Sequence, residues 1–119
     1  MLLELLGFWP RIEKLPPRDA YEGAKRGEVV IVDVRTPGEW ANTGCPRGSH
    51  RITLKDAKLI DSVRGLLAQK PEAIVALSCL SGHRAKSAAR KLKKSGIENL
   101  RIVEGGIIGW RKSGLPVDS

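Results

Sequence analysis

The stretch AIVALSCLSGHRAKSAAR, residues 73–90, joins an apolar run to a helical pattern through one cysteine and a short loop. Residues 73–79 are continuously apolar apart from one serine, which is typical of a strand covered on both faces. Beyond the loop, the apolar residues have the spacing of a narrow helical stripe: Ala85, Ala88, Ala89 and Leu92. We therefore predict a strand, a loop and a helix, with Cys79 at the carboxyl end of the strand.

The flanking sequence repeats this alternation of strand and helix. Buried-strand runs occur at residues 29–34 (VVIVDV) and 100–103 (LRIV), and helical patterns at residues 18–25 and 59–70. A turn with one or two turns of helix is expected in TPGEWANTG, residues 36–44, and a short strand at residues 51–54. This alternation predicts an α/β fold with a central, mostly parallel sheet and helices on both faces.

Length and charge limit the classes of function. The 119 residues suffice for one compact core, and 21 Lys and Arg against 13 Asp and Glu give a net charge of +8. Such a charge attracts small anions, acidic partners or nucleic acid. The aromatic residues are scattered and form no stacking platform, so nucleic acid is not predicted as a ligand: Phe8, Trp9, Tyr21, Trp40 and Trp110.

The opening residues and the cysteines argue against other classes. The stretch MLLELLGFWP, residues 1–10, has neither a basic leader nor a cleavage site and is too short to span a bilayer; we expect an amphipathic turn there. Cys45 and Cys79 are too few for a disulfide scaffold, and no clustered ligands predict a metal or a cofactor. A reducing, cytoplasmic location follows as the expectation.

The loop after Cys79 has the features of an anion cradle. Gly82 allows successive backbone N–H groups to turn toward the sulfur, the following helix adds its positive end, and Arg84 adds a full charge. These features favour negative charge on the sulfur and would also bind an anion. The residues alone leave two interpretations of Cys79 open, a nucleophile or a small apolar filler.

The Cys79 loop belongs to a longer pattern of five segments along the chain: VVIVDVRTPGEW, TGCPRGS, SCLSGHRA, VEGGIIGW and GLPV. In order and spacing, this pattern resembles the rhodanese-type sulfurtransferase family from about residue 15 to residue 117. The resemblance implies an N-terminal extension at residues 1–14 and a rhodanese-like domain at residues 15–119. It also implies that Cys79 takes the outer sulfur of a thiosulfate-like or persulfide donor, forms a persulfide, and passes the sulfur to cyanide or a thiol.

The same resemblance assigns roles to individual residues. The loop residues Leu80, Ser81, Gly82, His83 and Arg84 are expected to bind the substrate, with Arg84 on the sulfonate end of the donor. Asp33 and Arg35 are expected to be architectural, pairing with Glu39 or with the loop backbone. Gly105 and Gly106 are expected to form a tight turn near the site, and Trp40 and Trp110 to belong to the core.

Two other functions remain as alternatives. Phosphatases and arsenate reductases of related fold also use a cysteine loop ending in arginine, but their loop has five residues between the two, whereas four separate Cys79 from Arg84. Ser78 also stands where a tyrosine-phosphatase signature has histidine. The second alternative is a regulatory, non-catalytic rhodanese-type module, against which the retained cysteine argues.

Two features are particular to this chain. Cys45 stands where the family usually has histidine, which raises the hypothesis that it resolves the Cys79 persulfide into a disulfide; a structural role is the alternative. The helix at residues 85–95 carries five cations and is the expected face for an acidic protein partner.

Overall fold

A five-stranded parallel sheet forms the centre of the molecule. The computed structural model describes residues 11–119, so the expected turn at residues 1–10 lies outside the described residues. The strand order is β1-β6-β5-β2-β4, with β1 (Lys14–Leu15), β2 (Val29–Asp33), β4 (His50–Arg51), β5 (Ile74–Ser78) and β6 (Leu100–Val103). A separate antiparallel pair consists of β3 (Cys45–Pro46) and β7 (Val117–Asp118).

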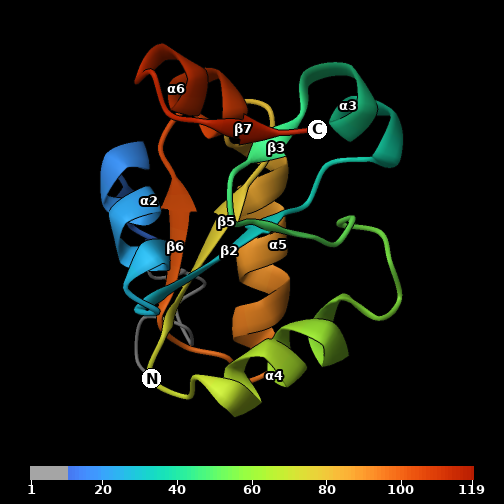
Figure 1. Cartoon of the computed structure of the whole chain (residues 1–119). Helices are drawn as coiled ribbons and strands as arrows, with labels where there is room; N and C mark the ends of the chain where they lie inside the picture. Colours follow the sequence, from blue (N-terminus) through green and yellow to red (C-terminus); the bar gives the residue numbers. More distant parts are fainter. Residues whose placement is uncertain (1–10) are drawn as a thin grey trace.

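The helices pack on both faces of this sheet, as predicted, and two of them flank it in Figure 1. Their bounds are α2 (Pro17–Lys25), α3 (Pro37–Thr43), α4 (Leu59–Gln69), α5 (His83–Lys94) and α6 (Gly106–Lys112). Alternate residues of β2 explain the two layers: Val30 and Val32 pack with α4 and α5, whereas Val29 and Ile31 pack with α2 and α6. All five residues of β2 are buried, which is why its sequence is a continuous apolar run rather than an alternating one.

The differences from the predicted elements are local. The strand expected at residues 51–54 is His50–Arg51, although the amides of Ile52 and Leu54 still donate to the carbonyls of Asp33 and Val34. Helix α6 was predicted only as a turn, because Gly105, Gly106 and Gly109 weaken its helical pattern. Strand β1 (Lys14–Leu15) lies across the expected boundary between an N-terminal extension (residues 1–14) and the domain (residues 15–119). That division stays a proposal.

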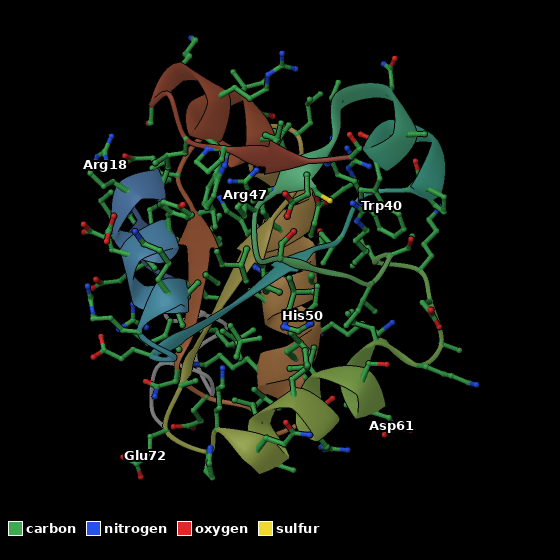
Figure 2. The ribbon with its side chains drawn as sticks, in the orientation of Figure 1. Arg18, Trp40, Arg47, His50, Asp61 and Glu72 are labelled. Atoms are coloured by element: carbon green, nitrogen blue, oxygen red, sulfur yellow. The ribbon has the colours of Figure 1, made fainter. Side chains whose placement is uncertain are left out.

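The two tryptophans predicted to lie in the core, Trp40 and Trp110, differ in burial. Trp110 is fully buried, and its indole N–H donates to the carbonyl of Pro116 at 2.7 Å, so its predicted place in the core is confirmed. Trp40 on α3 is only partly buried, although its indole nitrogen is enclosed and has no hydrogen-bond partner. Figure 2 shows Trp40 below α3, whereas Asp61 and Glu72 extend outward at the opposite end.

Among the described residues, no helix is long and apolar enough to cross a membrane.

Candidate active site

Cys79 follows the central strand and precedes α5. Asp33 and Ser78 are paired in the parallel register of β2 and β5, so both strands end at the same edge of the sheet. Figure 1 shows α3, α6 and the β3–β7 pair gathered at this end of the molecule. The carboxyl edge of a parallel sheet is the usual location of a binding site in α/β proteins.

The loop that follows Cys79 turns back toward its sulfur. The backbone N–H of Gly82 donates a hydrogen bond to Sγ of Cys79 at 3.0 Å, and α5 begins at the next residue, His83. Cys79 is only 1% exposed, whereas the next residue, Leu80, is 44% exposed. The sulfur therefore lies at the bottom of a loop whose amide and helix end both favour negative charge.

Of the residues predicted to bind substrate, only Gly82 has a direct hydrogen bond to the sulfur in the structure. Ser81 and His83 are exposed, the latter in the first turn of α5. Arg84 lies one residue further along α5 and is partly buried. The roles of these residues toward a substrate therefore stay predictions.

Arg84 forms a bidentate ion pair with Glu39. Nη1 of Arg84 lies 2.6 Å from Oε1 of Glu39, and Nη2 lies 2.8 Å from Oε2. This parallel arrangement is the strongest geometry for a guanidinium and a carboxylate. It also raises the pKa of Arg84, chiefly through the hydrogen bonds to Glu39.

Glu39 was not predicted as a site residue, and it is held by its own helix as well as by Arg84. In the first turn of α3 it forms a capping box with Thr36: the hydroxyl of Thr36 donates to Oε1 at 3.1 Å, and the amide of Glu39 donates to that hydroxyl at 3.4 Å. The hydrogen bonds from Arg84, followed by those from Thr36, lower the pKa of Glu39 to about 2. The sequence TPGE already shows the capping-box spacing, but nothing in it reveals the partner at residue 84.

Asp33 and Arg35 form a buried pair beside the site. Nη2 of Arg35 lies 2.8 Å from Oδ2 of Asp33, and both side chains are essentially inaccessible to solvent. Arg35 also donates to Oγ1 of Thr43 at 2.8 Å and to the carbonyl of Gly44 at 2.6 Å. The prediction that this pair would contact Glu39 or the loop was therefore wrong, because Arg35 uses its donors on Asp33 and on the end of α3.

Gly105 and Gly106 form a left-handed corner that supports the loop from behind. The amides of Ile107 and Ile108 donate to the carbonyls of Cys79 at 2.8 Å and of Leu80 at 3.3 Å. Gly106 has φ +57°, and a Cβ atom there would lie 2.4 Å from the Cys79 carbonyl oxygen and 2.6 Å from that of Leu80. Only glycine fits this close approach of the two backbones.

Cys45 is buried in the β3–β7 pair rather than in the Cys79 loop. Its Sγ lies 3.8 Å from the carbonyl oxygen of Asp118, and both cysteines are free thiols. Within residues 11–119, no three His, Cys, Asp or Glu side chains gather as metal ligands.

Comparison with known proteins adds a family to this geometry. Residues 16–113 match the family model described as Rhodanese-like domain. An uncharacterized protein of Synechocystis sp. is 30% identical over 105 residues, which cover 86% of this chain and 54% of that protein. The chain thus spans about half the length of this relative.

Two further similarities cover nearly whole proteins. Thiosulfate sulfurtransferase GlpE of Glaesserella parasuis is 26% identical over 106 residues, covering 88% of this chain and 92% of the relative. The crystal structure of a rhodanese-related protein from Thermoplasma volcanium superposes with a TM-score of 0.70 at 29% identity, covering 89% of this chain and 97% of that one.

Proposed function

Because this chain belongs to the rhodanese-like domain family, we propose that it is a sulfurtransferase that carries a sulfane sulfur on Cys79. The observation that carries the proposal is the hydrogen bond from the Gly82 amide to Sγ of Cys79 at 3.0 Å, at the start of α5. A donor fixed in this position stabilises negative charge on the sulfur before reaction. A cysteine that only filled space would not need such a donor.

The proposed cycle has two displacements. The Cys79 thiolate attacks the outer sulfur of thiosulfate, the sulfur–sulfur bond of the donor breaks, and sulfite leaves with the electron pair. The product is a persulfide on Cys79. An acceptor such as cyanide or a thiol then attacks the outer sulfur of this persulfide, and the thiolate of Cys79 is released.

The loop residues supply the proposed binding groups. The backbone of Leu80, Ser81, Gly82 and His83 surrounds the persulfide. Arg84 is the proposed contact for an anionic donor, which must compete with Glu39 for the guanidinium. His83 is solvent-exposed at the entrance to α5, where its side chain can contact an acceptor.

Phosphoryl transfer is a weaker proposal for the same loop. Only four residues separate Cys79 from Arg84, one fewer than a phosphatase cradle has, and Arg84 is already paired with Glu39. A second alternative is a binding module that performs no turnover. The two alternatives differ from the proposal in one measurable property, since neither forms a cysteine persulfide.

The decisive experiment is intact-mass measurement under non-reducing conditions after incubation with thiosulfate. Wild-type protein is expected to gain one sulfur atom, and Cys79→Ser none. Cyanide should then remove that sulfur and yield thiocyanate, which is measured colorimetrically. Absence of the added sulfur with both thiosulfate and a small persulfide would overturn the proposal, and hydrolysis of an aryl phosphate would support the phosphatase alternative.

Cys45→Ala is the matched control for this experiment. Because the sulfur of Cys45 faces the backbone of β7, we propose that its role is structural and that this variant loads and discharges sulfur like wild type. A Cys45–Cys79 disulfide formed during turnover, detected as a mass loss of two hydrogens in the wild type only, would instead support the resolving role.

Charge and compartment complete the proposal. Beyond Arg84, five cations on α5 make this helix the proposed face for an acidic protein acceptor: Lys86, Arg90, Lys91, Lys93 and Lys94. Persulfide transfer to such a partner should slow as ionic strength rises.

A cytoplasmic location belongs to the same proposal, because a nucleophilic thiol requires reducing surroundings.

A further inference from the structure

The positive charge expected to attract an anionic donor is already neutralised. Both terminal nitrogens of Arg84 are occupied by the two oxygens of Glu39, at 2.6 and 2.8 Å. The side chains are 37% and 30% exposed, so the pair lies at the surface of the site and not in the core. An oxyanion that approaches Arg84 must therefore compete with an attached carboxylate.

Moving Glu39 away from Arg84 is also unfavourable. Its Oε1 accepts from the amide and the hydroxyl of Thr36, at 3.3 and 3.1 Å, so that releasing Arg84 by moving Glu39 would also break the capping box of α3. The carboxylate is thus preorganised toward Arg84 by its own helix. Because Thr36 already holds Glu39 in this position, an anionic ligand displaces the Glu39 carboxylate from Arg84 less readily.

The buried charges beside the loop are paired with each other as well. The carboxylate of Asp33 is paired with Arg35 in the core. Arg35 also donates hydrogen bonds to Thr43 and Gly44. The groups left to stabilise negative charge on sulfur are the Gly82 amide and the N-terminal end of α5. These groups suit a single sulfur atom and supply no full charge for a sulfonate.

We propose that Glu39 is a specificity-determining positioning residue, which neutralises Arg84 and thereby disfavours donors with an oxyanion leaving group relative to persulfides of uncharged thiols. The inference rests on the sulfurtransferase function proposed above. In the favoured reaction, the Cys79 thiolate attacks the terminal sulfur of R–S–SH. The sulfur–sulfur bond breaks, RS⁻ leaves with the electron pair, and the proton stays on the transferred sulfur. No oxidant or reductant is consumed.

The test compares two donors on one protein. Single-turnover loading of Cys79 is measured by intact mass with thiosulfate and with the persulfide of 2-mercaptoethanol, whose leaving group carries no charged oxygen. In Glu39→Gln, the ratio of the thiosulfate to the persulfide rate constant should rise roughly five- to tenfold, because the charge of Arg84 is unmasked. The thiosulfate rate of this variant should also fall more steeply with added salt than that of wild type.

Two control variants separate charge from structure. Thr36→Ala removes the hydroxyl that supports Glu39 and keeps the carboxylate, so it should retain the wild-type donor ratio even if α3 is less stable. The double variant Glu39→Gln with Arg84→Gln keeps the summed charge of the pair and should also return the ratio to near the wild-type value.

The outcomes distinguish this inference from the proposed function. If wild type loads sulfur from neither donor, the sulfurtransferase proposal fails. If wild type loads sulfur but the ratio is unchanged in Glu39→Gln, or if both rates change by the same factor, Glu39 does not determine specificity and the inference is overturned.

Discussion

The backbone amide of Gly82 lies 3.0 Å from the sulfur of Cys79 and donates a hydrogen bond to it. Gly82 reaches this position with φ +136° and ψ −20°, a conformation that residues with a side chain rarely adopt. A Cβ atom at Gly82 would meet no other atom within 4 Å. The constraint on this residue is therefore its backbone conformation and not the space around it.

Gly82→Ala should thus slow persulfide formation at Cys79 by about tenfold or more, because the strained backbone relaxes and the amide turns away from the sulfur. Rapid-quench loading with thiosulfate measures the rate. Gly96→Ala is the matched control, since Gly96 at the other end of α5 also has a positive φ, of +90°, with open space around it. Both variants should lose about 1–2 kcal/mol of stability, and equal loading rates in the two would contradict the role given to the Gly82 amide.

Gly106 constrains the Cys79 loop through a close steric contact with its backbone. Gly106→Ala would bring Cβ to 2.4 Å from the carbonyl oxygen of Cys79, so the loop or α6 must shift. We expect a loss of about 2 kcal/mol or more in the free energy of unfolding, together with slower sulfur loading. Urea denaturation and intact-mass kinetics measure the two effects.

Gly105→Ala separates contact from backbone strain at this corner. Gly105 also has a positive φ, of +74°, but its Cβ would approach Gly109 at 3.0 Å and not the loop. This variant should lose stability while its sulfur loading stays closer to that of wild type than the loading of Gly106→Ala does. Identical loading defects would show that the corner acts only through general stability.

Features that depend on neighbouring residues were predictable from the sequence, whereas contacts between residues far apart in the chain were not. The runs of β2 and β5 were recognisable because their burial on both faces requires continuous apolar sequence. The Cys79 loop was recognisable because its parts are neighbours in the chain. The ion pair between Glu39 and Arg84 spans 45 positions, and no local pattern of either residue indicates the other.

The missed elements have a similar explanation. Strands β1, β3 and β7 contain two residues each, too few to show a periodicity. They form because the rest of the fold presents a partner: Lys14 and Leu15, for example, pair with Ile102 and Val103. Helix α6 contains two glycines, Gly106 and Gly109, which local propensity disfavours, and the burial of Ile107 and Trp110 overrides that preference.

The Asp33–Arg35 pair should contribute mainly to stability. Arg35→Met leaves the Asp33 carboxylate in a site with 0% exposure and without its partner, which should cost about 3–5 kcal/mol in the free energy of unfolding. The double variant with Asp33→Asn should recover part of that loss, because the unpaired charge is gone. Urea denaturation of the two single variants and the double variant measures the coupling, and strictly additive losses would contradict an ion-pair interaction.

The ion pair at Glu39 gives folding a pH dependence of defined sign. Arg84 and Thr36 lower the pKa of Glu39 from 4.5 to about 2 in the folded protein. A carboxyl group with a lowered pKa stabilises the folded state above its unfolded pKa, and this stabilisation is lost as the pH falls through the folded value. The contribution of Glu39 is therefore complete at neutral pH and decreases between about pH 4.5 and pH 2.

Glu39→Gln removes this titration, so its difference from wild type should report it directly. Above about pH 4.5, the free energy of unfolding of wild type should exceed that of Glu39→Gln by a constant amount, and the difference should shrink steadily toward pH 2. Urea denaturation across this range measures both proteins, and groups that titrate alike in the two cancel. Glu72→Gln is the control, because the side chain of Glu72 extends outward at the far end of the molecule (Figure 2). A difference between wild type and Glu39→Gln that is flat down to pH 2, or one that grows on acidification, would show that Glu39 is not held ionised by Arg84.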